Sequence, residues 1–174
     1  MQPPHLDTHN RSVAKESAGL LLYRRRDGTL EVLLVHPGGP FWKRREEGAW
    51  SLPKGEIEQG ERPIEVARRE FQEELGQSPP EGSFTPLGTI RQAGGKVVHA
   101  WAAPGDLDVE RVESGTFRVE WPPRSGRTQE FPEVDRATWF DLQTARRMIL
   151  QAQSTFLDRL EAALSTQDRQ RASS

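Results

Sequence analysis

The segment from Gly55 to Gly76 reads GEIEQGERPIEVARREFQEELG. Its second half predicts the clearest helix in the chain, from Pro63 to Leu75, because proline stands in the first turn and Gly76 follows the end. At about 100° per residue, four apolar side chains form one stripe along this helix: Ile64, Ala67, Phe71 and Leu75. An apolar stripe must be buried, so the helix is expected to pack against the core.

Three glutamates gather on one side of this predicted helix. Glu70 and Glu74 lie one turn apart on the flank of the apolar stripe, and Glu73 lies further round, towards solvent. Like charges at this spacing destabilise a helix by roughly a few tenths of a kcal/mol, and carboxylates near the C-terminal end oppose the helix dipole. The cluster is therefore either a well-solvated face or a cation site, and carboxylate oxygens suit Mg²⁺ or Mn²⁺.

The segment before the helix favours the cation site. Ser51-Leu52-Pro53-Lys54-Gly55-Glu56 leads through Gly60-Glu61 into the helix, and the whole stretch resembles the signature box of the Nudix hydrolases. All the fixed positions of that box are present: Gly55, Glu61, Arg69, Glu70, Glu73, Glu74 and Gly76, with apolar Phe71. One position departs, because Gln77 stands where the family has an apolar residue. That residue packs the helix exit, so the departure concerns local packing and not chemistry.

The resemblance implies roles for the box residues. Glu70 and Glu74 would be the principal ligands of Mg²⁺ or Mn²⁺, and Glu73 a further ligand or the base that deprotonates water. The bound ion would neutralise phosphate charge and lower the pKa of a water molecule. Arg69 resembles the arginine that orients these carboxylates, and Glu61 the residue that ties the loop to the helix.

Members of the family often supply one more acidic ligand or base from a distant loop. The segment from Gln129 to Asp135 precedes a predicted strand at 137–140, which is the expected place. Glu133 and Glu130 are equal candidates for this distal acid, with Glu120 behind them, and an ordinary surface carboxylate is the alternative for each.

Two segments are candidates for substrate contacts. Lys54, in the box loop, is placed to contact a phosphate, unless it is a solvent-exposed loop lysine. The loop from His36 to Arg45 combines glycines, aromatic residues and cations; Phe41 or Trp42 would stack on a base, and Lys43 and Arg44 would hold phosphates. The alternative is a loop whose aromatic side chains pack on the sheet.

The rest of the chain predicts strands interrupted by helices, with hairpins present. Strands are expected at 18–24, 30–36, 50–52, 85–92, 96–102, 116–121 and 137–140, and further helices at 142–149, capped by Asp141, and at 154–164. This order indicates a mixed sheet covered by helices, and the resemblance implies the Nudix-type α/β/α sandwich. A single domain is expected over residues 16–164, between flexible tails at 1–15 and 165–174.

Composition narrows the function. The 174 residues carry a net charge of −2, which argues against general nucleic-acid binding, and no apolar run is long enough to cross a membrane. The absence of cysteine and the lack of a signal-like N-terminus favour a cytoplasmic location. The expected function is metal-dependent hydrolysis of a diphosphate linkage in a nucleoside diphosphate derivative, such as a dinucleoside polyphosphate or a nucleoside triphosphate. The alternative is a noncatalytic Nudix-fold module that binds nucleotides. Many relatives pair, so a homodimer is a further expectation.

Overall fold

Two long apolar runs form the centre of the sheet, β1 (Glu16–Arg26) and β2 (Thr29–Pro37). In the computed structural model, which describes residues 13–174, they form an antiparallel hairpin. Its two turn residues, Asp27 and Gly28, both have positive φ, at 51° and 78°, which matches the strand twist of a tight hairpin. Both faces of β1 and β2 are buried, so each strand carries a nearly continuous apolar run instead of an alternating one.

The main sheet has six strands in the order β4-β5-β1-β2-β8, and β3 pairs with β1 off this path. The additional strands are β3 (Lys54–Glu56), β4 (Thr85–Arg91), β5 (Val97–Pro104) and β8 (Val134–Asp141). β1 runs parallel to β5 and antiparallel to β2 and β3. The sheet is therefore mixed, as predicted.

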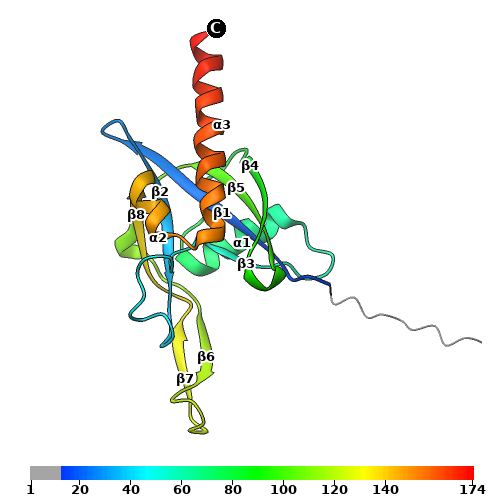
Figure 1. The fold of residues 1–174 in the computed structure, drawn as a ribbon, viewed down its shortest axis with the longest axis vertical. Helices are drawn as coiled ribbons and strands as arrows, with labels where there is room; N and C mark the ends of the chain where they lie inside the picture. Colours follow the sequence, from blue (N-terminus) through cyan, green and yellow to red (C-terminus); the bar gives the residue numbers. More distant parts are fainter. Residues whose placement is uncertain (1–12) are drawn as a thin grey trace, which may run out of the picture.

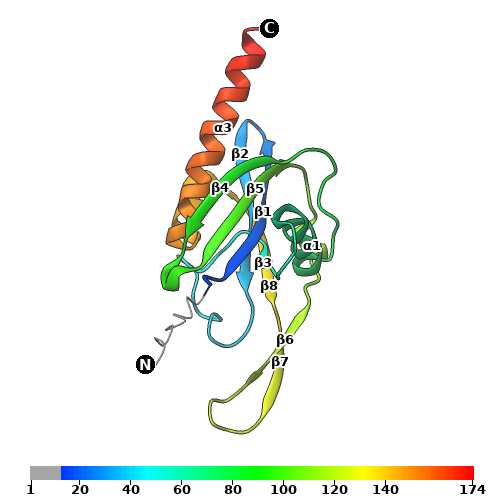
Figure 2. The ribbon, with the colours of Figure 1, turned by 90° about the vertical axis from the view of Figure 1, so that its right-hand side faces the viewer.

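Helices cover both faces of this sheet (Figures 1 and 2). α1 (Pro63–Leu75) lies on one face, and α2 (Leu142–Met148) and α3 (Ser154–Ala172) lie on the other. Each face has its own core: Phe71 of α1 belongs to one buried cluster and Phe156 of α3 to the other. This arrangement confirms the predicted α/β/α sandwich, and three short 3-10 helices complete it: Ala93–Gly95, Val109–Arg111 and Gln151–Gln153.

A second, two-stranded sheet projects from the end of the molecule opposite the C-terminus (Figures 1 and 2). It consists of β6 (Thr116–Glu120) and β7 (Thr128–Pro132), and we call residues 116–132 the arm. β6 matches the predicted strand at 116–121, whereas β7 was expected to be an acidic loop. The sequence of β7 lacks apolar alternation because most of its side chains are exposed.

Two predicted elements differ from the structure. Trp50 and Ser51 form only isolated bridges, to Ile149 and Val35, and the strand that enters the box begins at Lys54. Pro53 explains the shift, because proline has no N–H to continue a ladder, and its carbonyl instead accepts a hydrogen bond from the Leu20 N–H at 3.1 Å.

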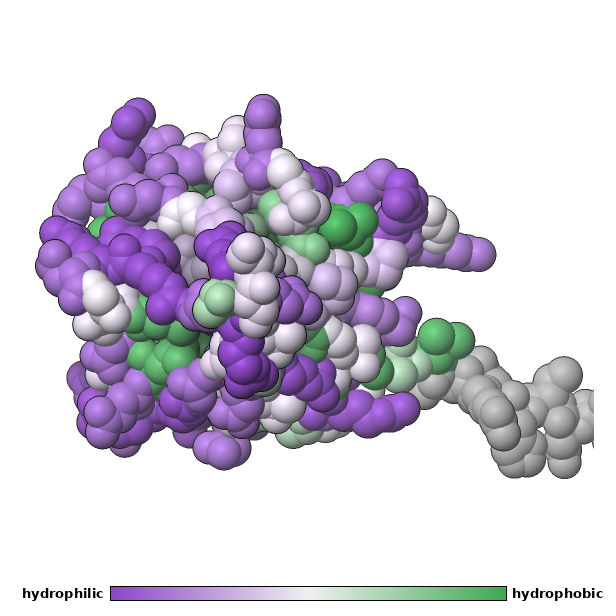
Figure 3. Space-filling view, turned by 90° about the horizontal axis from the view of Figure 1, so that it is seen from above, coloured by the Kyte–Doolittle hydropathy of each residue, from purple (hydrophilic) through white to green (hydrophobic). Residues whose placement is uncertain are grey.

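The closing helix is longer than predicted and runs past Leu164 to Ala172. Leu164 is its last buried residue, and the turns beyond it consist almost entirely of polar residues and project from the body (Figure 1). The face from which α3 projects is mostly hydrophilic (Figure 3). Within residues 13–174, no helix has the length and apolar character needed to cross a membrane. The first 12 residues of the predicted N-terminal tail lie outside the described part of the chain.

Candidate active site

The box helix α1 begins and ends where the sequence predicts. Pro63 occupies its first turn, and Gly76 closes it in the left-handed conformation with φ 68°. The Gly76 N–H donates to the Gln72 carbonyl at 2.7 Å. Gln77, the residue that departs from the box pattern, donates from its side chain to the Asp108 carbonyl at 3.0 Å. A hydrogen bond thus replaces apolar packing at the helix exit.

Glu70 packs directly on the backbone of β3. A Cβ at Gly55 would lie 2.0 Å from the Glu70 carboxyl carbon, so only glycine leaves room for this side chain. The Glu70 side chain is 14% exposed. Burial raises its pKa, the negative charges of Glu73 and Glu133 raise it further, and Arg69 lowers it.

Glu74 lies deeper than Glu70. Its Oε2 atom accepts a hydrogen bond from the Lys54 backbone N–H at 3.3 Å. Burial raises the pKa of Glu74 to about 8, against an ordinary value of 4.5; the Lys54 charge lowers it, and the charges of Glu70 and Glu133 raise it. Burial also lowers the pKa of the Lys54 amine, although Glu74 opposes that shift. Lys54 is therefore a half-buried cation beside the box carboxylates and not a free loop lysine.

Glu133 approaches these glutamates from the turn between β7 and β8. Its backbone is held on two sides: its N–H donates to the Gly115 carbonyl at 2.9 Å, and its carbonyl accepts from the Gly38 N–H at 3.0 Å. A cleft of about 180 Å³ lies here, and we call it the box cleft. Its lining includes Glu133, Glu74, Lys54 and Trp42.

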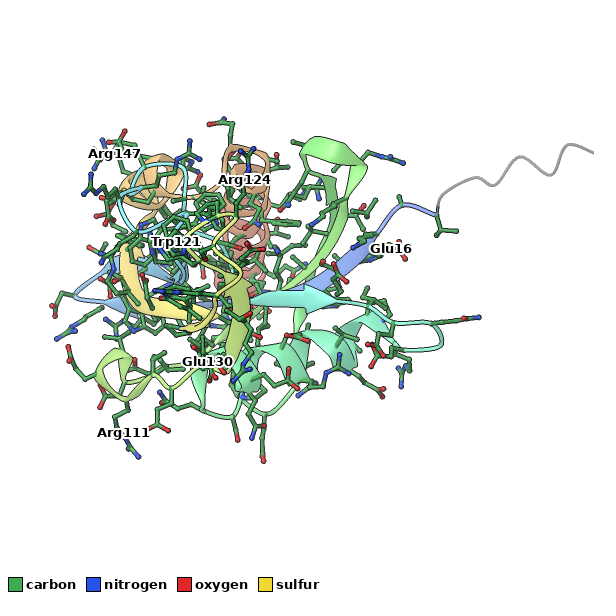
Figure 4. The ribbon with its side chains drawn as sticks, turned by 90° about the horizontal axis from the view of Figure 1, so that it is seen from below. Glu16, Arg111, Trp121, Arg124, Glu130 and Arg147 are labelled. Carbon is green, nitrogen blue, oxygen red and sulfur yellow. The ribbon has the colours of Figure 1, made fainter. Side chains whose placement is uncertain are left out.

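Glu130, the equal candidate for the distal acid, lies elsewhere. It belongs to β7, accepts a hydrogen bond from the Thr116 hydroxyl at 2.7 Å and pairs with Arg118 at 3.7 Å. In Figure 4, which looks towards the end of the arm, Glu130 lies on one side of the arm and Trp121 and Arg124 lie on the other. The geometry therefore brings Glu133 to the box and engages Glu130 within the arm.

Arg69 joins three carboxylates outside the box cleft. It donates two hydrogen bonds to Glu61, one of them at 3.4 Å, and lies 3.6 Å from Glu70 and 3.8 Å from Glu73. Glu61 also accepts from the Glu58 N–H at 2.9 Å, and both contacts lower its pKa, that from Arg69 more strongly. This is the loop-to-helix tie expected for Glu61 and Arg69.

Glu73 is the most exposed of the three clustered helix glutamates, with a side chain that is 56% exposed, and lies 3.8 Å from Arg69. Among residues 13–174, no three acidic or histidine side chains converge to the spacing of a ready-made metal cluster. The chemistry of the donor set nevertheless fits a hard divalent cation. Glu70 and Glu74 are partly buried carboxylates, and burial is the main cause of their raised pKa values. The charge of Glu133 raises both pKa values and the charge of Glu70 raises that of Glu74, so a cation among these carboxylates would relieve their repulsion.

The loop that follows the ladder of β2, residues 37–48, carries the expected substrate-binding residues Trp42, Lys43 and Arg44. We call it the 37–48 loop, and these residues divide between its two faces. Trp42 lines the box cleft and lies 5.6 Å below the Arg45 guanidinium. Lys43 and Arg44 instead line a larger cleft between this loop and the arm. His36, at the start of the loop, is fully buried. His99 lies in β5, 3.2 Å from Glu16.

One buried residue that positions the box loop was missed. Gln153 is fully buried, accepts a hydrogen bond from the Leu52 N–H at 3.1 Å and donates to the Ser51 hydroxyl at 3.1 Å and to Gln92 at 2.8 Å. It holds the segment that leads into Lys54. No pattern in the sequence marks it, because its partners are 61 to 102 positions away along the chain.

The geometry defines a mixed α/β sandwich with an acidic helix on one face. The chain belongs to the Nudix family: the family model described as NUDIX domain matches residues 14–160. This membership confirms the enzyme class predicted from the sequence, a Nudix pyrophosphohydrolase.

Solved structures share the fold. A binary complex of an Ap4A hydrolase from C. elegans has a TM-score of 0.62 and 23% identity, over 88% of this chain and 99% of that one. The NUDIX domain of Shewanella oneidensis NrtR, complexed with ADP ribose, has a TM-score of 0.61 and 21% identity, over 91% and 94%. A mutT/nudix family protein from Listeria innocua has a TM-score of 0.60 and 18% identity, over 90% and 98%.

Proposed function

We propose that this chain hydrolyses a diphosphate linkage in a nucleoside diphosphate derivative, with Mg²⁺ or Mn²⁺ held by Glu70 and Glu74. The observation that carries the proposal is that Glu74 and Glu133, from two distant segments, line one cleft together with Lys54, while Glu70 packs against Gly55 beside it. The likeness to an Ap4A hydrolase and to an ADP ribose complex supports a nucleotide-derived substrate.

The cation would neutralise phosphate charge and lower the pKa of a water molecule. Glu133 would complete the ligands, and its position in the lining of the box cleft with Glu74 supports this role. Glu73, next to Glu70 and open to solvent, is the candidate to accept the proton of the attacking water or to add a ligand. Arg69 and Glu61 act as positioning residues, because they contact the box glutamates and the loop and lie outside the cleft.

Lys54 would hold a phosphate oxygen, and the presence of Lys54 in the lining of the same cleft as Glu74 and Glu133 supports this role. Trp42 forms the neighbouring wall and offers an indole face to the nucleoside part of the substrate. In the reaction, the water oxygen forms a new bond to phosphorus as the bond to the bridging oxygen breaks. Two fragments with terminal phosphates result.

A substrate panel tests this proposal. The full chain is incubated with dinucleoside polyphosphates, ADP-ribose, sugar nucleotides and nucleoside triphosphates, with Mg²⁺, with Mn²⁺ or with a chelator, and the products are identified by mass. We expect cleavage between two phosphorus atoms in at least one class, and none in chelator. Nucleotide binding without cleavage of any compound would instead identify a noncatalytic module.

A further inference from the structure

A second cleft lies between the 37–48 loop and the arm, and we call it the arm cleft. Its volume is about 730 Å³, and its lining includes Phe41, Lys43, Arg44, Trp121 and Phe131. Phe41 and Lys43 line the arm cleft, whereas Trp42 between them lines the box cleft. The loop is therefore a wall with a binding surface on each side, and none of the box glutamates lines the arm cleft.

The aromatic side of the arm cleft presents a ring to solvent. Phe41 is 61% exposed, an unusual position for a large apolar side chain. The ring is supported from the arm by Trp121, which meets it edge to face with centroids 5.5 Å apart. An exposed aromatic face held in place by a second ring is a platform on which a planar base can stack.

The cationic side of the arm cleft is unneutralised. Within residues 13–174, neither Lys43 nor Arg44 forms an ion pair. Asp135, the acidic residue of the lining, is bound by His36 at 2.8 Å and lies 3.7 Å from Arg136. The cleft therefore combines free positive charge with an aromatic platform, which complements a phosphate joined to a planar base.

The walls of the arm cleft are fixed to one another by close contacts. The buried His36 ring lies 2.8 Å from Asp135 Oδ1 through Nδ1 and 2.6 Å from the Arg45 carbonyl oxygen through Nε2, so it joins the loop to β8. Gly38 packs so tightly on the arm that a Cβ there would lie 1.8 Å from the Pro132 carbonyl oxygen. The cleft is thus built by packing and does not depend on a chance approach of two flexible segments.

We propose that the arm cleft is a second binding site, for a nucleoside phosphate whose base stacks on Phe41 and whose phosphate is held by Lys43 and Arg44. The site goes beyond the proposed hydrolysis, because its residues are separate from the box glutamates. Its ligand is either a free nucleotide or the far nucleotide of a substrate that reaches round the loop.

Calorimetric titration of AMP into the full chain in EDTA tests the site, since without a divalent ion the box carboxylates repel phosphate. We expect Phe41→Ala to weaken binding about tenfold, the worth of one stacked base. Lys43→Ala and Arg44→Ala should weaken it at low salt and have a smaller effect as salt rises. Val13→Ala and Arg111→Ala, matched exposed controls, should leave binding unchanged.

Unchanged AMP affinity in Phe41→Ala would overturn the assignment, and loss of binding in Glu74→Gln at the same time would place the AMP in the box cleft instead. Adenosine and inorganic phosphate should each bind more weakly than AMP; equal binding of phosphate alone would also contradict the site. If AMP competes with turnover and Phe41→Ala raises KM, the arm cleft binds the far nucleotide of the substrate. If KM is unchanged in Phe41→Ala, the arm cleft binds a free nucleotide. Both results support the site, and a chain that hydrolyses nothing would still bind AMP here.

Discussion

The backbone N–H of Lys54 donates to the Glu74 side chain at 3.3 Å, and this contact joins the box loop to the box helix. This hydrogen bond does not compensate for the loss of hydration of the carboxylate, because burial still raises the pKa of Glu74 to about 8. Without a cation, the carboxyl of Glu74 therefore carries a proton at neutral pH. Glu70 is shifted in the same direction. These carboxylates are therefore costly to keep charged in the absence of a cation.

Glu74→Gln should stabilise the chain at high pH when divalent ions are chelated. The pKa of Glu74 is raised on folding from 4.5 to about 8, so the stability linked to its protonated form is fully present below about pH 4.5 and is lost as pH rises through 8. Glutamine stays neutral and escapes this loss, which amounts to up to about 5 kcal/mol at about 1.4 kcal/mol per pKa unit.

Urea unfolding in EDTA at pH 5 and pH 9 measures this difference. Glu73→Gln is the matched control and should change stability little at either pH, because its side chain is 56% exposed. An advantage of Glu74→Gln that fails to grow between pH 5 and pH 9 would contradict the raised pKa.

Gly55→Ala should abolish turnover while leaving a folded protein. A Cβ at this position would lie 2.0 Å from the Glu70 carboxyl carbon, so the carboxylate must move away from its place beside β3. Gly115→Ala is the control, since its Cβ would lie 3.9 Å from Glu133, an ordinary contact. Turnover and circular dichroism of both variants test the point. Wild-type turnover in Gly55→Ala would show that the position of Glu70 does not matter.

Glu133→Gln and Glu130→Gln separate the two candidates for the distal acid. We expect Glu133→Gln to lower metal-dependent turnover at least about tenfold, the lower end for groups that support a metal site, because Glu133 lines the cleft with Glu74. Glu130→Gln should keep wild-type turnover, since Glu130 is bound to Thr116 and Arg118 in the arm. The reverse order of effects would exclude Glu133 from the site.

Gln153→Ala should lower the free energy of unfolding by about 2–4 kcal/mol. The substitution removes three hydrogen bonds and leaves the Leu52 N–H unsatisfied in a dry interior, where such a group costs about 1–3 kcal/mol. Gln151→Ala, an exposed neighbour, should have little effect. Denaturant unfolding of the two variants measures the difference; equal stability would mean that the Gln153 side chain does not hold the box loop.

The sequence was most informative where local pattern and packing agree. The helix bounds at Pro63 and Leu75 were predicted to the residue, because apolar spacing, the proline and Gly76 all indicate the same element. The β1–β2 hairpin was equally accessible from its two apolar runs and the turn at Asp27. Glu70 and Glu74 could be placed at the edge of the core by counting around the helix.

What sequence could not supply depends on contacts between distant segments. Glu133 and Glu130 are alike in type and neighbourhood, and only the pairing of β7 with β6 sends Glu130 into the arm. The same pairing brings Trp121 to Phe41 across some eighty positions and creates the arm cleft. Gln153 could not be identified from the sequence for the same reason, since its side chain forms its hydrogen bonds with residues far away along the chain.

Titration of Mn²⁺ into wild-type and Glu74→Gln protein, with turnover measured on the same samples, tests whether Glu70 and Glu74 hold a divalent cation that hydrolysis requires. We predict wild-type affinity that rises between pH 6 and pH 8 as Glu74 ionises, and binding at least about tenfold weaker in the variant, together with lost turnover. Equal Mn²⁺ affinity and equal turnover in the two proteins would show that Glu74 does not hold the ion that hydrolysis requires.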